Sequence, residues 1–220
     1  MRLLSLLLGL AAAPLPLLVG SGEVIDCLAI SVGRAAVTRS AIEEQARITA
    51  FLNRVPVDNS PAARRRTAER VVDVVLIRRE MEISRYAPAE PADVDKLLER
   101  VRAERGNKPE QFQRELEQYK IDEGALRRHL ALQSQTLRFV ELRFRPGSSV
   151  TESEVDLYYR DQFLPEFTRN NPNKPAPELE QIRDRLEAEM LDQRVEQAME
   201  QWLKEARAQT RVRYFEERCQ

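Results

Sequence analysis

The last eleven residues of the chain, "TRVRYFEERCQ" at positions 210–220, decide how it folds. They end a long stretch with a helical pattern, yet Thr, Val, Tyr and Phe are residues that favour a β-strand. A strand needs a partner, and the other strand-like run, "VIDCLAISVGRAAVT" at positions 24–38, lies at the opposite end of the sequence. We therefore predict that the two ends of the chain pair antiparallel in a small sheet.

The sequence between these ends has the apolar spacing of amphipathic helices. Capping boxes begin two of the expected helices, one formed by Ser40 with Glu43 and one by Thr151 with Glu154. The sequence thus predicts a mostly α-helical fold with a small β element that joins the N-terminal and C-terminal strands. The expected helices cover residues 40–53, 62–86, a stretch that ends at 105, 109–119, 122–144, a stretch that begins after 151, and about thirty residues from 179.

The final helix is too long and amphipathic to bury its apolar stripe without a partner, so we expect it to dock on the earlier helices. Before it, "TRNNPNKPAPE" has the prolines and asparagines of an exposed linker. We therefore predict a single helical core made of residues 23–167 and 178–220, joined by a linker at 168–177.

The N-terminus has the layout of a secretory signal peptide: a positive start, an apolar run at residues 3–13 and small residues before a cleavage point near Ser21 or Gly22. A membrane anchor is the alternative, but it needs about 20 uninterrupted apolar residues. Pro14 and Pro16 interrupt this run. We predict that residues 1–22 are removed on export and that the mature chain is not inserted stably in a membrane.

The two cysteines, Cys27 and Cys219, lie near the outer ends of the two predicted strands. Directly opposed residues of antiparallel strands have Cα atoms about 4.5–5.5 Å apart, which a disulfide can span. Exported proteins meet an oxidising compartment, where such a pair is more plausibly bonded than catalytic. We predict a Cys27–Cys219 disulfide, with two free thiols as the alternative.

Several classes of chemistry have no support in the sequence. The charges balance to a net −1, so no basic face suggests nucleic acid. His129 is the only histidine and the cysteines are far apart, so no metal site is predicted. No phosphate-binding glycine loop occurs. We therefore expect no cofactor and no enzymatic activity.

Four segments of the sequence, taken in order, are informative together. They are "ISVGRAAVTRSAIEEQ" at 30–45, "KPEQFQRELEQYKIDEGALRRHL" at 108–130, "VTESEVDLYY" at 150–159 and "IRDRLEAEMLDQRVEQAMEQWLKEARAQTRVRYF" at 182–215. In this order they resemble SurA-type periplasmic chaperones: an opening strand, turn and helix, then paired helices, then the helix that closes the N-terminal region, and finally a long last helix with its strand. The similarity extends over nearly all of residues 24–217.

The resemblance implies a nucleotide-independent holdase in the periplasm, whose partners are unfolded client polypeptides, chiefly outer-membrane β-barrel proteins. Family members usually insert a parvulin-type prolyl isomerase domain before the last helix. Such a domain needs on the order of a hundred residues. Only residues 164–177 are available here, so we expect no isomerase. Two alternatives remain: an interaction or assembly subunit with one dedicated partner, and a degenerate isomerase, against which the lone His129 also argues.

Two sets of apolar residues lie at irregular junctions, one where a helix meets the linker and one at the end of the first helix. We predict that both sets contribute to apolar grooves for clients, with ordinary core packing as the alternative. The residues are Phe163, Leu164 and Phe167 in the first set, and Phe51, Leu52 and Val55 in the second. We assign Tyr158, Tyr159 and Trp202 to the core.

Overall fold

A computed structural model describes residues 26–105 and 108–215, and these are mostly helical with a small antiparallel sheet, as the sequence predicts. Two strands begin the described chain and a third ends it. The elements are β1 (Leu28–Val32), β2 (Ala35–Thr38), α1 (Arg39–Asn53), α2 (Pro61–Ile83), α3 (Pro91–Glu104), α4 (Pro109–Gln118), α5 (Glu123–Arg143), η1 (Arg145–Gly147), α6 (Glu152–Tyr158), η2 (Tyr159–Phe163), α7 (Leu164–Asn170), α8 (Leu179–Gln209) and β3 (Val212–Tyr214).

The sheet has the order β2-β1-β3 in the described chain, and both pairings are antiparallel. Gly33 turns the β1–β2 hairpin with φ of 59°, a left-handed conformation that favours glycine. Across β1 and β3, Ile30 faces Tyr214 and Val32 faces Val212. The predicted pairing of the two ends of the chain is therefore confirmed.

The described pairing of β1 with β3 includes neither cysteine. Its last pair, Ile30 with Tyr214, lies three residues after Cys27 on one strand and five residues before Cys219 on the other. Cys219 lies outside the described residues, so the disulfide stays a prediction.

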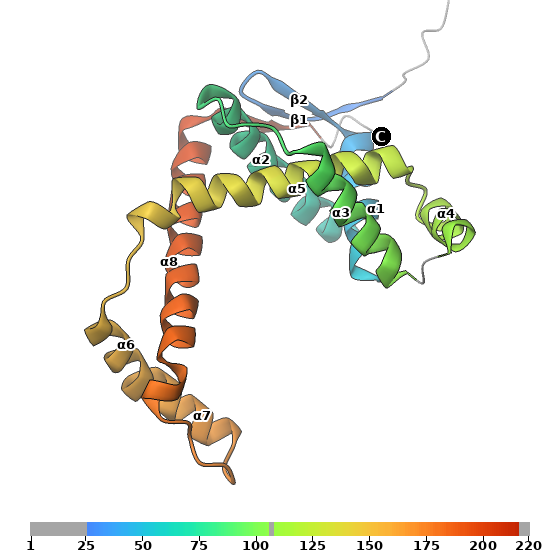
Figure 1. The fold of residues 1–220 in the computed structure, drawn as a ribbon. Helices are drawn as coiled ribbons and strands as arrows, with labels where there is room; N and C mark the ends of the chain where they lie inside the picture. The colour runs from blue at the N-terminus through green and yellow to red at the C-terminus, as the bar shows by residue number, and fades with distance from the viewer. Residues whose placement is uncertain (1–25, 106–107, 216–220) are drawn as a thin grey trace, which may run out of the picture.

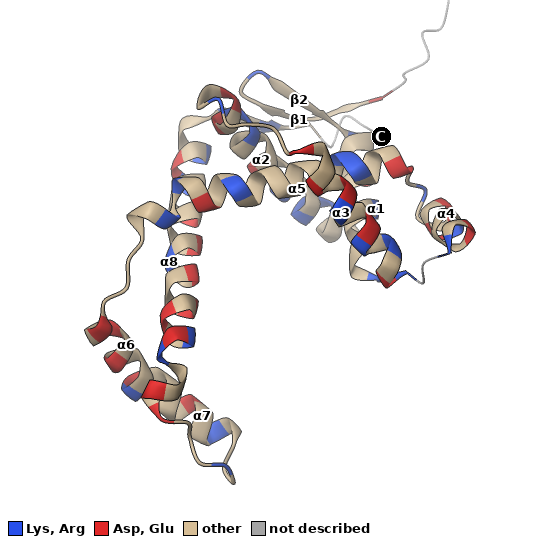
Figure 2. Cartoon of the chain, in the orientation of Figure 1, with Lys and Arg blue, Asp and Glu red and all other residues tan. Residues whose placement is uncertain are grey.

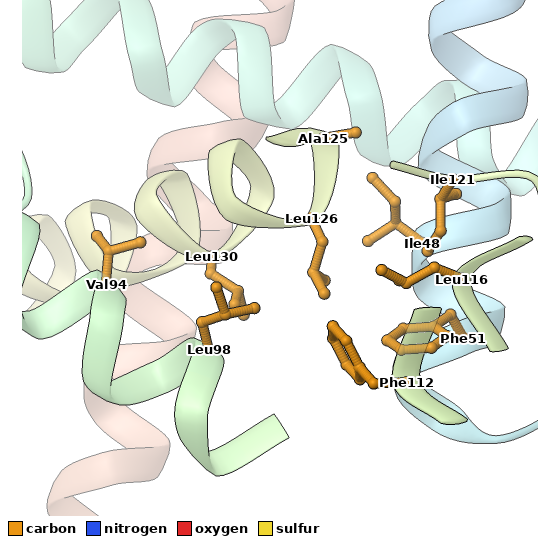
Figure 3. Packing of buried hydrophobic residues seen from close by; sticks show 10 residues of the cluster. All are labelled: Ile48, Phe51, Val94, Leu98, Phe112, Leu116, Ile121, Ala125, Leu126 and Leu130. Carbon is orange, nitrogen blue, oxygen red and sulfur yellow. The ribbon is translucent and has the colours of Figure 1, made fainter. Parts of the chain in front are cut away.

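The first of three apolar clusters joins α1, α3, α4 and α5 (Figure 3). Phe51 of α1 is fully buried at its centre and makes edge-on ring contacts with Phe112 and Tyr119, at centroid distances of 6.0 and 5.5 Å. The buried members of this cluster are Ile48, Phe51, Val94, Leu98, Phe112, Leu116, Ile121, Ala125, Leu126 and Leu130.

The other two clusters attach the last helix to the rest of the body. Beneath the sheet, side chains of β1, β2, α1 and α2 pack with Leu203 and Ala206 of α8. Next to it, the fully buried Phe139 of α5 contacts the ring of Trp202 of α8 at a centroid distance of 5.8 Å. Arg207 of α8 also donates to Asp73 of α2 over 2.6 Å. The long helix thus docks on the earlier helices by both apolar and charged contacts.

The molecule consists of a body and an arm (Figure 1). The sheet and α1–α5 form the body, and α8 runs from the sheet out to α6 and α7, which lie at the far end of the arm. We call α6, η2, α7 and residues 179–195 of α8 the distal lobe. Arg145, just beyond α5, donates to Asp192 of α8 over 2.7 Å, where the arm leaves the body.

The start of α1 differs from the sequence prediction. The N-cap of α1 is Thr38, whose hydroxyl accepts from the Ala41 N–H over 3.3 Å, and the predicted Ser40–Glu43 capping box is wrong. The Ser40 hydroxyl is instead occupied by Asp26, and this hydrogen bond is the main cause that lowers the pKa of Asp26 to about 2. The other predicted box, at the start of α6, is confirmed.

The helix that begins at Glu152 continues farther than the sequence suggests. It passes through η2 and α7 to Asn170, so residues 168–170 of the predicted linker are helical. The chain then turns through a proline-rich segment, and α8 begins at Leu179. This longer helix is what forms one side of the distal lobe.

Candidate functional site

Three aromatic side chains line one side of the distal lobe. The rings of Tyr159 and Phe163 stack with centroids 5.7 Å apart and an interplanar angle of 18°. The rings of Phe163 and Phe167 follow at 5.6 Å and 31°. Arg185 of α8 places its guanidinium 5.7 Å from the centroid of the Phe163 ring. We call Tyr159, Phe163 and Phe167 the aromatic ladder.

The helix that carries the ladder changes pitch just before Pro165. Pro165 has no N–H, and its ring would clash with the carbonyl four residues earlier in a regular α-helix. The chain widens into a π-helical turn over residues 159–163, in which the Leu164 N–H donates to the Tyr159 carbonyl. Such turns inside α-helices occur frequently at functional sites. Tyr159 and Phe163 lie at the two ends of this turn, and residues four apart are neighbours on a helix surface.

The distal lobe is too thin to bury the ladder. Its fully covered apolar side chains are Val155, Leu186 and Val195, whereas all three ladder residues remain half-buried. Leu157 on α6 is 48% exposed. In Figure 1, α6 and α7 lie beside the far end of α8, away from the other elements of the described chain. Aromatic surface therefore stays available on the outside of the molecule.

Polar contacts fix α6 and the ladder on α8. Asp156 pairs with Arg183 over 2.9 Å, and the Tyr159 hydroxyl donates to the carbonyl of Pro177 over 2.7 Å. Glu154 accepts from the Thr151 N–H and from Arg194, and these bonds lower the pKa of Glu154 to about 2. Glu154 is therefore a carboxylate at neutral pH. These links orient the ladder relative to α8.

The structure brings together the first predicted set of site residues and places the second elsewhere. Phe163 and Phe167 are neighbours in the aromatic ladder. Leu164, which follows Phe163 in the sequence, is half-buried. The second set lies in the body, at the end of α1, far from the distal lobe in Figure 1. Its three members differ in exposure, and the prediction of client contact is wrong for one of them.

The prediction that Phe51 contributes to a client groove is wrong. Its side chain is fully buried and also lies 4.2 Å from the Arg105 guanidinium, so it is a core residue that cannot contact a client. Leu52 is half-buried against the same cluster, and Val55 is 47% exposed. The sequence alone did not show that α3, α4 and α5 cover the end of α1.

Sequence reasoning also missed two members of the site. Tyr159 was assigned to the core, but its half-buried ring begins the aromatic ladder. The signal for it was present, because Tyr159, Phe163 and Phe167 are each four residues apart. Arg185 had no such signal, since its position over Phe163 depends on how α8 packs.

A second concave region, of 410 Å³, lies beside α4 and is rich in arginine. Two of its arginines satisfy carbonyls at helix ends: Arg54 donates to the Glu104 carbonyl over 2.7 Å, and Arg105 donates to the Phe51 carbonyl. Arg105 also pairs with Glu115 over 3.0 Å. This positive charge therefore offsets helix C-termini, and the region carries no argument for an anion site.

No group of three or more His, Cys, Asp or Glu side chains in residues 26–105 and 108–215 could hold a metal ion. No helix in the same ranges is both long enough and apolar enough to cross a membrane.

His129, on α5, is half-buried, with Nδ1 3.2 Å from the Gln45 side-chain nitrogen. Burial lowers its pKa from the ordinary value of 6.5, because the cation loses hydration. The folded state therefore binds the proton more weakly than the unfolded state does. Its contribution to stability is complete above pH 6.5 and is lost as the pH falls below that value.

Proton NMR and urea unfolding across this pH range test the expectation directly. The single imidazole should titrate below 6.5. As the pH falls below this value, the unfolding free energy of a His129→Gln variant should decline less than that of the wild-type protein. An imidazole that titrates at or above 6.5 in the folded protein would contradict the assignment of burial as the dominant effect.

Comparison with known proteins does not assign the chain to a family: no family model matches it, and no curated protein matches it.

Proposed function

We propose that this chain is a nucleotide-independent periplasmic chaperone, a holdase that keeps unfolded client proteins soluble. The observation that carries the proposal is the half-buried aromatic ladder at the end of a long arm. Aromatic side chains dominate the energy of many interfaces, because each can bury 150–250 Å² of surface. The ladder would bind apolar segments of a client that have not yet folded.

The surroundings of the ladder suit reversible binding. Positive and negative side chains are interspersed along α8 and over the body, which would keep a complex with an apolar client soluble (Figure 2). The contact area is shallow, so each contact is weak and several are needed for retention. This favours a carrier that releases its client without nucleotide hydrolysis.

The client class and the compartment come from the sequence. The N-terminal segment has the layout of a signal peptide and predicts export, although residues 1–22 lie outside the described part of the chain. The resemblance to SurA-type chaperones suggests outer-membrane β-barrel proteins as clients. We propose the periplasm as the compartment and these proteins as the client class.

Light scattering tests the holdase function. A denatured outer-membrane β-barrel protein is diluted into buffer with and without the purified protein, in the absence of nucleotide. We expect near-stoichiometric amounts of the protein to suppress the rise in scattering. If folded protein fails to suppress it, the holdase proposal is wrong, and a subunit with one dedicated partner becomes the explanation to pursue by affinity capture.

Removing the ladder should weaken this activity. The double variant Phe163→Ser and Phe167→Ser deletes the middle ring and one end ring of the ladder. Truncation of central interface aromatics typically costs about 2 kcal/mol, or roughly 30-fold in affinity. We expect a corresponding rise in the concentration that halves the scattering. Leu142→Ser, which alters a 61% exposed leucine on α5, is the matched control and should behave as wild type.

Circular dichroism and thermal melting must show that both variants fold. Equal suppression of scattering by the double variant and by Leu142→Ser would remove the ladder from the client site.

A further inference from the structure

The charges of the molecule are unevenly divided between its two parts. The distal lobe, residues 152–170 and 179–195, contains ten Asp and Glu and five Arg, which gives it a formal net charge of −5. The other described residues contain 28 Lys and Arg against 23 Asp and Glu, a formal net charge of +5 (Figure 2). The lobe holds its excess in about a quarter as many residues. Negative charge is therefore concentrated at the end of the arm.

Most positive side chains of the lobe already have a partner within it. Three of its five arginines pair with lobe carboxylates, and Arg185 lies over the ring of Phe163. Five exposed carboxylates of the lobe, in contrast, have neither an ion pair nor a side-chain hydrogen bond within residues 26–105 and 108–215. These carboxylates are Glu152, Glu166, Asp184, Glu187 and Glu189. The uncompensated charge of the lobe thus lies on its surface.

Two of these carboxylates lie close to the aromatic ladder. Glu166 follows Phe163 by three residues on the ladder helix, and Glu189 follows Arg185 by four residues on α8. Side chains at these spacings are neighbours on a helix surface. The half-buried rings of the ladder therefore lie on a surface with an excess of negative charge. A group that fits there offers apolar surface to the rings and positive charge to the carboxylates around them.

This charge distinguishes between the possible occupants of the ladder. The distal lobe of a second copy has the same formal charge of −5, so two lobes repel each other. The ends of the chain also lack positive charge, because residues 1–25 have a formal net charge of 0 and residues 216–220 of −1. A client segment that combines apolar side chains with Lys or Arg satisfies both the rings and the carboxylates.

We propose that the distal lobe selects client segments in which Lys or Arg lie next to apolar side chains. This inference rests on the proposed holdase function and names the class of segment that the aromatic ladder takes. Opposite charge raises the rate of encounter, and the rings then hold the apolar part of the segment. The body has a positive excess and repels the same segments, so they collect at the end of the arm.

Two labelled peptides test this selection on the wild-type protein. Both have the same Phe, Leu and Ser residues, and one has Lys at the positions where the other has Glu. Binding is measured by fluorescence anisotropy. At low ionic strength we expect the Lys peptide to bind about ten-fold more tightly than the Glu peptide. In 1 M NaCl, where the screening length is about 3 Å, the difference should fall to within about two-fold. Equal binding at low ionic strength, or tighter binding of the Glu peptide, would overturn the proposal.

A pair of double variants assigns the effect to the lobe. Glu166→Gln with Glu189→Gln removes two uncompensated charges beside the ladder. Glu82→Gln with Glu117→Gln changes the total charge equally at two exposed positions of the body and is the matched control. We expect the lobe variant to bind the Lys peptide about three- to five-fold more weakly than wild type, and the control to bind it as wild type does. An equal loss in both variants would overturn the assignment to the lobe. Circular dichroism must show that both variants fold.

Two further readouts separate this inference from its alternatives. A salt-sensitive dimer in sedimentation, which both the lobe variant and the Lys peptide dissociate, would assign the lobe to the body of a second copy and overturn the proposal. Light scattering with the denatured client runs in parallel. Suppression of scattering by a protein that shows no preference between the peptides would refute the charge selection alone, whereas no suppression at all would refute the holdase function.

Discussion

Replacing Phe139 by alanine is expected to lower the free energy of unfolding by about 3–5 kcal/mol, the usual cost of truncating a buried phenylalanine. The Phe139 ring is fully buried and contacts three other rings: Tyr86 at 5.2 Å, Phe144 at 5.8 Å and Trp202 at 5.8 Å. These rings come from three regions of the chain. The variant would leave a cavity where α5, the end of α2 and α8 meet.

Urea unfolding measures this loss, and Leu137→Ala provides the control. Leu137 lies two residues away on the same helix and is 61% exposed, so its truncation should change the unfolding free energy by no more than about 0.5 kcal/mol. A loss of similar size for both variants would mean that α8 does not dock through this cluster. A loss for Phe139→Ala far below the expected value would also mean that α8 does not dock through this cluster.

Breaking the predicted Cys27–Cys219 disulfide is expected to have an effect of similar size. The bridge would close a loop of almost the whole chain, and restriction of the unfolded state by so long a loop is worth about 4–5 kcal/mol. The Cys27 main chain is also fixed to the start of α1, since its carbonyl accepts from the Arg39 N–H over 2.8 Å. Cys27→Ser should therefore lower the unfolding free energy by roughly this amount.

Unfolding with and without dithiothreitol provides the control. The reductant should destabilise the wild-type protein and leave Cys27→Ser unchanged, because that variant has no bridge to reduce. Mass spectrometry after alkylation gives the direct reading. Two reactive thiols in unreduced protein taken from an oxidising compartment would contradict the bridge.

The sequence was sufficient to predict the pairing of the chain ends. Strand-forming residues at 210–215 had one plausible partner, and the amphipathic pattern of α8 required it to return to the body. Both signals are local, and pairing of the two chain ends satisfies both of them. The structure confirms the pairing, with Val32 opposite Val212.

Details that depend on competition between neighbours could not be predicted. Thr38 and Ser40 are both good N-caps, and Asp26 decides between them by engaging the Ser40 hydroxyl. Phe51 lies at the end of a helix, where exposure is common, and three distant helices bury it. Such outcomes depend on packing between segments far apart in sequence.

The aromatic ladder falls between these cases. The spacing of its residues was visible, but the π-helical turn between Tyr159 and Phe163 depends on how the helix adjusts to Pro165. The prolines and asparagines of residues 168–178 indicated a linker from residue 168, whereas the helix continues to Asn170.

The central claim is that the distal lobe contacts unfolded clients, and site-specific photocrosslinking tests it most directly. A photoreactive phenylalanine analogue is placed at Phe163 or Phe167. The control carries it at Ile83, a 67% exposed residue at the C-terminal end of α2 in the body. Each protein is irradiated with a denatured outer-membrane β-barrel protein. The account predicts crosslinks to the client from residues 163 and 167, well above those from residue 83. Crosslinks from residue 83 alone, or equal yields from all three positions, would contradict it.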